Sequence, residues 1–220
     1  MQRLFDIKKT QIQLVLDRGY QVPPEESGIP TMTIEEFAVY VNTIATANKI
    51  APRAALSRYY EDKDETGAVR RTMLVFFGGK TEPQQKQVSA DVVRRFIQSV
   101  QAYNVTEAVL IVDAPLSSTG NNELNALTLV RWQIFNDSDL TYNPTRHVDT
   151  PRHELLEPGA ARELLRDMKV DVSKLLIIKS NDPVIRYYGW PIGGIVRVHR
   201  NDRSVSILAP KSVNYRIITD

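Results

Sequence analysis

The chain has 220 residues, 42% of them apolar, which is enough for one large folded domain or two small ones. It contains no cysteine, which excludes disulfides, thiolate metal sites and thiol nucleophiles, and no apolar run approaches the roughly 18 residues that span a membrane. Residues 1–145 hold 15 Lys and Arg against 17 Asp and Glu, and residues 146–220 hold 13 against 9. We therefore expect a soluble intracellular protein whose contacts with nucleic acid, if it makes any, are supported by a larger partner.

Two amphipathic helices are predicted in the first 50 residues. The first has apolar residues near helical spacing from Leu4 to Leu16 and ends where Gly19 can adopt a left-handed conformation. The second begins at Thr33, which forms a capping-box pattern with Glu36. Its apolar positions follow at periods of three and four: Ile34, Phe37, Ala38, Val41, Ile44 and Ala45.

The middle of the chain alternates strands and helices. A hairpin is expected around the charged tip at residues 61–67, with residues 69–77 as its second strand. Ser89 is placed to cap a helix, and residues 107–113 are apolar on both faces, which is typical of a central strand. A short helix with Leu124, Leu127 and Val130 and a strand at 132–135 complete the pattern. We predict an α/β domain, a mixed sheet with flanking helices.

A polar, proline-bearing stretch at residues 143–151 marks the predicted domain boundary. We place an N-terminal domain at 1–145 and a small α+β domain at 146–220. The second domain is expected to hold a helix with Leu164, Leu165 and Met168 inward and strands at 175–178, 195–198 and 215–218. Between them, residues 182–189 (DPVIRYYG) contain a helix start and stop, with Asp182 as N-cap and Gly189 after the last turn.

Few residues indicate a catalytic or metal-binding site. His147, His153 and His199 lack the convergent spacing of a zinc site, so we interpret them as surface or capping residues. Residues 117–120 (SSTG) lack the glycines and lysine of a nucleophile elbow or phosphate loop and are interpreted as a turn. Gly193 and Gly194 are interpreted in the same way. No cofactor is expected.

Two alternatives stay open at this point. One is a metal-dependent nuclease in which Glu61, Asp62 and Asp113 hold a cation and Lys63 helps to activate water. A charged hairpin tip in solvent is the simpler interpretation of residues 61–65. The other is an adaptor that binds only protein. For such an adaptor, replacement of Ser117 to Thr119 and of Arg94-Arg95 would cause no loss of DNA binding.

Residues 182–189, with Gly193, the strand at 195–198 and the pair Tyr215-Arg216, strongly resemble the fifth-largest subunit of eukaryotic nuclear RNA polymerases and its archaeal RNA polymerase counterpart. Residues 151–156 (PRHELL) are similar to the segment that opens the same domain in that family. Residues 8–10, 17–20 and 73–77 resemble its eukaryotic N-terminal helix and central hairpin strand. The resemblance therefore covers nearly the whole chain and indicates the two-domain eukaryotic type.

The resemblance implies a non-catalytic subunit of a DNA-dependent RNA polymerase, whose catalytic Mg²⁺ belongs to partner subunits. The N-terminal domain would form a jaw near downstream double-stranded DNA, and the C-terminal domain would dock on the largest subunit beside neighbouring small subunits. The expected location is the nucleus, or the virion or viral replication site for a viral protein. Expected docking residues are His153, Asp182, Pro183, Arg186, Tyr187, Gly189, Gly193, Tyr215 and Arg216. Expected nucleic-acid contacts are Ser117, Ser118, Thr119, Arg94 and Arg95.

The chain departs from the family in three places. The proline usual in the DNA-facing loop is replaced near Ser118, an acidic pair becomes Asp202-Arg203, and the connection from Asn201 to Asn214 is longer than usual, which indicates an added hairpin. Such divergence fits a protist polymerase or one encoded by a large DNA virus.

Overall fold

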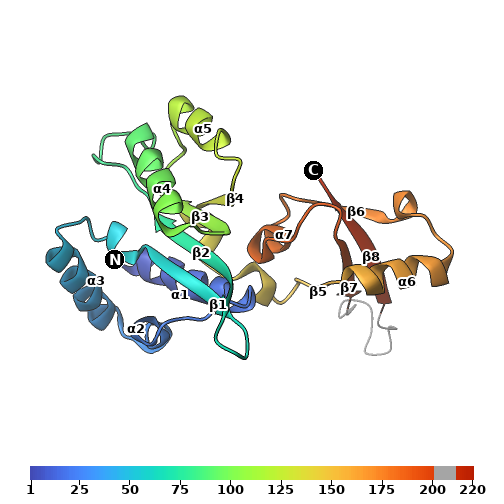
Figure 1. Cartoon of the computed structure of the whole chain (residues 1–220). Coiled ribbons are helices and arrows are strands. Elements are labelled where there is room, and N and C mark those ends of the chain that lie inside the picture. The colour runs from blue at the N-terminus through green and yellow to red at the C-terminus, as the bar shows by residue number, and fades with distance from the viewer. Residues whose placement is uncertain (201–211) are drawn as a thin grey trace. The chain divides into compact units, whose positions relative to one another are not determined.

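A computed structural model describes residues 1–200 and 212–220 of the chain (Figure 1). The departures expected at 202–203 and in most of the connection 201–214 thus lie outside the described residues. The chain divides into two compact units, Met1–Tyr142 and Asn143–Asp220, each with its own sheet. Within the described residues, no helix has both the length and the apolar character needed to cross a bilayer.

Two helices of the N-terminal unit lie where the sequence predicts them. Helix α1 (Gln2–Asp17) is followed by Gly19 at φ 86°. Helix α3 (Ile34–Asn48) carries the full capping box of Thr33 and Glu36. One assignment is wrong: Leu16 lies on the outer face of α1 and is 53% exposed. Between and after these helices lie three short helices: α2 (Pro24–Ser27), η1 (Ile29–Thr31) and η2 (Ala54–Leu56).

The sheet of this unit is mixed, as expected. Strands β1 (Arg58–Lys63) and β2 (Val69–Phe77) form the antiparallel hairpin, and β3 (Glu107–Val112) and β4 (Arg131–Asn136) add in parallel in the order β1-β2-β3-β4. Every residue of β3 is buried, which confirms it as a central strand. A short helix η3 (Asp137–Leu140) follows β4.

Helices cover both faces of this sheet (Figure 1). Helix α4 (Ala90–Tyr103) packs Val93 and Phe96 against Leu110 and other apolar residues of one face, and α5 (Ser118–Asn125) lies beside α4. Helix α1 lies on the other face, where the Lys8 ammonium approaches the Phe77 ring. Residues 117–120 are not a simple turn, as the sequence led us to expect, but the start of α5, because the Ser117 hydroxyl accepts a hydrogen bond from the backbone N–H of Gly120.

The C-terminal unit is a four-stranded sheet between two helices. Its sheet order is β5-β7-β8-β6, with β6 parallel to β8 and the other pairs antiparallel. One core cluster under α7 contains Ile185 and Val196, and a second under α6 contains Ala161 and Ile195. The expectation that Met168 points inward is wrong, since it is 43% exposed at the end of α6. The elements are η4 (Pro144–Arg146), β5 (Arg152–Leu155), α6 (Pro158–Met168), η5 (Val172–Lys174), β6 (Leu176–Lys179), α7 (Pro183–Tyr188), β7 (Ile195–Arg200) and β8 (Ser212–Thr219).

Candidate docking and nucleic-acid surfaces

Helix α7 is short but fixed at both ends. The Asp182 carboxylate accepts hydrogen bonds from the backbone N–H groups of Val184 (2.9 Å) and Ile185 (3.4 Å). Pro183 lies in the first turn, where its missing N–H would have no helical partner. Gly189 ends the helix at φ 66°, a left-handed conformation that glycine adopts without strain. The predicted start and stop at 182–189 are confirmed.

The two tyrosines of α7 have different environments. Tyr187 is only 1% exposed, and its hydroxyl accepts a hydrogen bond from the Asn143 side-chain amide (2.9 Å). We expect one of two adjacent tyrosines to pack into its own domain, and it is this one, so Tyr187 cannot offer its ring to a partner directly. Tyr188 is half-buried and stacks on Trp190 with ring centroids 4.5 Å apart. The sequence reasoning missed this pair, although aromatic residues on either side of Gly189 were the available signal.

His153 and Arg216 lie on the face of the sheet that α7 covers, near the start of that helix. His153 pairs with Val198, and Arg216 pairs with Val196, in the ladders that run from β5 to β8. Burial lowers the pKa of the His153 imidazole, while the Pro151 carbonyl, 2.7 Å from its Nδ1, and the nearby Asp182 carboxylate oppose that shift. The structure thus brings three of the expected docking residues into one neighbourhood: His153, Asp182 and Arg216.

Tyr215 does not belong to that neighbourhood. Neighbouring residues of a strand point to opposite faces, so Tyr215 lies on the α6 face while Arg216 lies on the α7 face. There the Arg197 guanidinium approaches the Tyr215 ring at 5.7 Å. Among the other expected docking residues, Arg186 is half-buried, and Gly193 is exposed at φ 83° with its N–H bonded to the Ile218 carbonyl. The expected docking set therefore spans both faces of the sheet.

The residues expected to contact nucleic acid are brought together by the packing of α4 against α5. Ser118 and Thr119 are exposed at the first turn of α5, where no acidic residue lies. Arg94 on α4 forms ion pairs with Asp91 (2.8 Å) and with Glu123 of α5 (2.7 Å). These pairs raise the pKa of the Arg94 guanidinium and compensate its charge, although the group is exposed. Arg95 is also exposed, and the described residues give it no ion pair.

The geometry contradicts the nuclease alternative. Glu61 pairs with Thr72, next to the start of β3, whereas Asp113 follows the last residue of β3. The strand between them is six residues long, which separates the two carboxylates by about 20 Å. Glu61 is ion-paired with Lys63 at 2.7 Å, and Asp113 accepts a hydrogen bond from the Lys80 backbone N–H. The carboxylates that this hypothesis needs therefore do not converge on one cation.

The histidines do not gather either. The His147 ring accepts a hydrogen bond from the Asp149 backbone N–H at 3.3 Å, and the His199 ring lies 3.3 Å from the Glu154 carboxylate. No group of three His, Asp or Glu side chains that could hold a metal ion occurs among residues 1–200 and 212–220.

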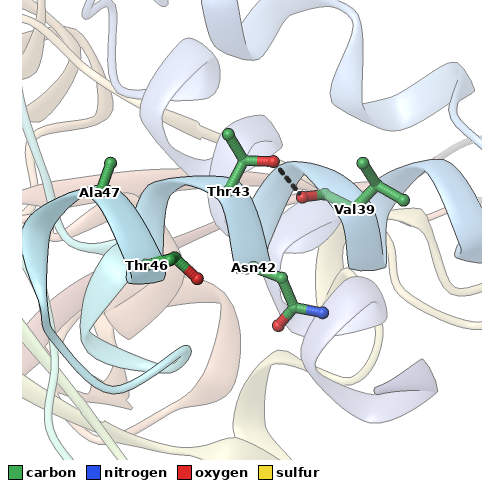
Figure 2. Close-up of a pocket in the computed structure, with 5 residues that line it drawn as sticks. All are labelled: Val39, Asn42, Thr43, Thr46 and Ala47. Carbon is green, nitrogen blue, oxygen red and sulfur yellow. Dashed lines mark hydrogen bonds between the residues drawn. The ribbon is translucent and has the colours of Figure 1, made fainter.

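A shallow, open depression lies along one side of α3 (Figure 2). All its lining residues come from this one helix, so it has no opposing wall: Val39, Asn42, Thr43, Thr46 and Ala47. The only hydrogen bond drawn among them joins the Thr43 hydroxyl to the Val39 carbonyl within the helix. The depression carries no charged or catalytic group and is not a candidate active site.

Two family models match the two units of the chain. The family model described as RNA polymerase Rpb5, N-terminal domain, matches residues 1–100, and the model of the RNA polymerase Rpb5, C-terminal domain, matches residues 142–218. The chain belongs to the Rpb5 family. The matched C-terminal segment contains α7, His153 and Arg216, the features that carried the resemblance in the sequence.

Full-length relatives match both units at once. The chain is 27% identical to DNA-directed RNA polymerases I, II, and III subunit RPABC1 of Caenorhabditis elegans, over 98% of this chain and 95% of the relative. It is also 27% identical to the subunit rpabc1 of the same polymerases in Dictyostelium discoideum, over 98% and 96%. DNA-directed RNA polymerases IV and V subunit 5B of Arabidopsis thaliana is 24% identical over 96% and 88%. Both units of the chain are thus accounted for by one kind of protein.

Proposed function

We propose that the chain is a non-catalytic subunit of a DNA-directed RNA polymerase and acts in transcription. The observation that carries this proposal is the match of both units to the two Rpb5 domains. The separation of Glu61 from Asp113 supports a role without an active site of its own. Because its relatives are named as subunits of eukaryotic polymerases, the location that follows is the nucleus.

The C-terminal unit is the one that docks, on the largest polymerase subunit and its small neighbours. Helix α7 supports this role because its ends are fixed by Asp182 and Gly189, so little conformational entropy is lost when a partner binds. Its exposed side offers the half-buried Arg186 and the stacked pair of Tyr188 and Trp190. Arginine, tyrosine and tryptophan are the residue types that dominate binding energy at protein interfaces.

The N-terminal unit lies near downstream DNA as a jaw. The start of α5 supports this role, since free backbone N–H groups and the hydroxyls of Ser118 and Thr119 suit phosphate oxygens. Arg95 adds an exposed positive charge on the neighbouring helix. The sparse charge of this surface fits a contact that holds DNA only when the rest of the polymerase is present.

Affinity purification of a tagged chain from its native cells, followed by mass spectrometry after a high-salt wash, tests the proposal. We expect the two largest polymerase subunits in stoichiometric amounts. Recovery of the chain alone, with nuclease activity that depends on Mg²⁺, would overturn the proposal. A tagged Arg186→Glu variant should recover less of the large subunits, whereas Arg166→Glu, an exposed change on α6, serves as its matched control.

A further inference from the structure

Strand β6 forms an apolar edge of the C-terminal sheet (Figure 1). In the part of the chain that the structure describes, it pairs with β8 alone. Leu176 and Ile177 point to opposite faces of the sheet, yet they are 56% and 57% exposed. Two large aliphatic side chains on a short edge strand are unusual, because proteins usually protect such edges with charge or with a covering segment.

The backbone of this edge has pairing capacity. In a parallel ladder, alternate residues direct their N–H and C=O groups to the neighbouring strand. The Ser180 N–H bonds to the Thr219 carbonyl of β8, so Ile177 and Lys179 are the residues whose backbone groups turn outward. Of these groups, the Lys179 carbonyl already accepts a hydrogen bond from the Asp182 N–H at 3.0 Å. In agreement, the Ile177 carbonyl accepts a long, 3.4 Å hydrogen bond from the side chain of Arg216. An added strand would find its pairing positions chiefly at the backbone N–H groups of these two residues.

Arg216 supplies a charge beside this edge. Its Nε is buried and has no hydrogen-bond partner, and the described residues offer its guanidinium no ion pair. The nearby His153 does not compensate it, since the imidazole is either neutral or positive. Lys179, at the other end of the strand, already donates to the backbone carbonyl of Asp220. Asp182 is the carboxylate of this neighbourhood, but it caps α7 and forms no ion pair with Arg216. A carboxylate placed next to Arg216 would therefore meet a cation that has no ion-pair partner among the described residues of this unit.

We infer that the β6 edge binds an extended segment of another polymerase subunit, which adds a strand outside Ile177 and Lys179 and places an Asp or Glu beside Arg216. This inference rests on the proposed docking role of the C-terminal unit and names where and in what conformation one partner segment binds. The apolar side chains of that segment cover Leu176 and Ile177. A helix in the same place would leave the outward backbone groups unpaired, and nucleic acid would leave the two aliphatic side chains exposed.

Amide hydrogen exchange tests this inference because it reports the exchange rates of the individual amides of β6. It is measured on the full chain alone and within the purified polymerase. We expect the amides of Ile177 and Lys179 to exchange at least about tenfold more slowly in the complex, as hydrogen-bonded strand amides do. Unchanged exchange at both amides in a complex that contains the chain would overturn the inference. That outcome leaves the proposed function standing, whereas failure to recover any polymerase subunit contradicts the proposed function itself.

Substitution gives a second measurement. Ile177→Lys puts a charge on an exposed edge residue. It should lower retention of the polymerase in high salt by about tenfold, which corresponds to a loss of about 1.4 kcal/mol in binding free energy. Arg216→Gln should lower it as well, and the Gln variant retains most of the side-chain length. Val148→Lys, at a loop residue that is 71% exposed, is the matched control and should retain the polymerase fully. Equal retention by all three variants contradicts strand addition.

Discussion

The two units of the chain use charge in opposite ways. The buried charged residues among those described all lie in the N-terminal unit: Lys8, Arg18, Glu26, Glu107 and Asp137. In the C-terminal unit, the ion pairs of Glu154 with Arg197 and His199 stay at the surface, with a third or more of each side chain exposed. The N-terminal unit therefore uses buried charge to join its elements, whereas the ion pairs of the C-terminal unit lie in contact with solvent.

The buried network around Glu26 should be the part of the N-terminal unit whose disruption lowers stability most. Lys8 of α1 contacts the Glu26 carboxylate at 2.7 Å and donates to the Leu56 carbonyl, and the Tyr60 hydroxyl donates to Glu26 at 2.6 Å. Glu26→Ala leaves the Lys8 ammonium buried without its counter-ion and should destabilise the N-terminal unit by about 3–5 kcal/mol. Urea unfolding measures this, with Glu25→Ala, an exposed neighbour, as the control that should change stability by less than about 0.5 kcal/mol.

The same network should give the N-terminal unit a distinctive pH dependence. Burial lowers the pKa of Lys8 from its ordinary 10.5 to about 8, opposed by Glu26, while the nearby Arg58 lowers it further. Above pH 8 the unfolded chain then holds a proton at this residue that the folded chain has lost, so the contribution of Lys8 to stability rises with pH.

Between pH 7 and pH 9.5 this gain should reach about 2 kcal/mol. Unfolding of the wild type and of a Lys8→Met, Glu26→Leu double variant, measured at both pH values, reveals it, because the double variant lacks the Lys8 ammonium that titrates in this range. Parallel pH profiles of the two proteins would show that Lys8 keeps its ordinary pKa in the fold.

The Asp182 cap of α7 should contribute less to the free energy of unfolding than the buried network around Glu26, and its main role should be in docking. Asp182→Ala removes the acceptor for two backbone N–H groups and should cost about 1 kcal/mol. Hydrogen exchange of the α7 amides measures this locally, and Asp182→Asn should restore most of the protection because asparagine caps helices about as well. Faster exchange in the Asn variant than in the Ala variant would contradict the capping role.

The two adjacent arginines of α4 should differ in their contact with DNA. Arg95→Ala should reduce the salt dependence of DNA retention by the purified polymerase by about one unit of slope, the effect of one phosphate contact. Arg94→Ala should have a smaller effect, because Asp91 and Glu123 already compensate its charge. A larger effect of Arg94 would mean that its ion pairs open when DNA binds.

Much of the fold could be predicted because the local signals were strong. The capping box at Thr33, the apolar run of strand β3 and the Asp182 cap all describe short-range physics, and all three are confirmed. The errors arose where tertiary packing decided the outcome. At residues 117–120 the local cap of Ser117 acts together with the close packing of α5 on α4, where Gly120 lies beside Val93, and both contribute to the start of the helix.

The candidate site was harder to predict from the sequence than the fold. Tyr187 and Tyr188 are adjacent and chemically alike, and only the fold shows that one is buried and the other stacks on Trp190. Likewise, Tyr215 and Arg216 follow one another in the sequence, but strand alternation places them on opposite faces. Which polar group lies beside a sheet edge depends on the sheet order, and that order is fixed by contacts between residues far apart in the chain.

Site-specific photo-crosslinking within the purified polymerase tests most directly whether the C-terminal unit docks on the largest subunit and the N-terminal unit contacts DNA. A photoreactive residue in place of Arg186 should crosslink to the largest subunit and not to DNA, and one in place of Thr119 should crosslink to DNA downstream of the active site. Crosslinks from Thr119 to protein alone would contradict the jaw role. Crosslinks from Arg186 to DNA would contradict the docking role and reverse the assignment of the two units.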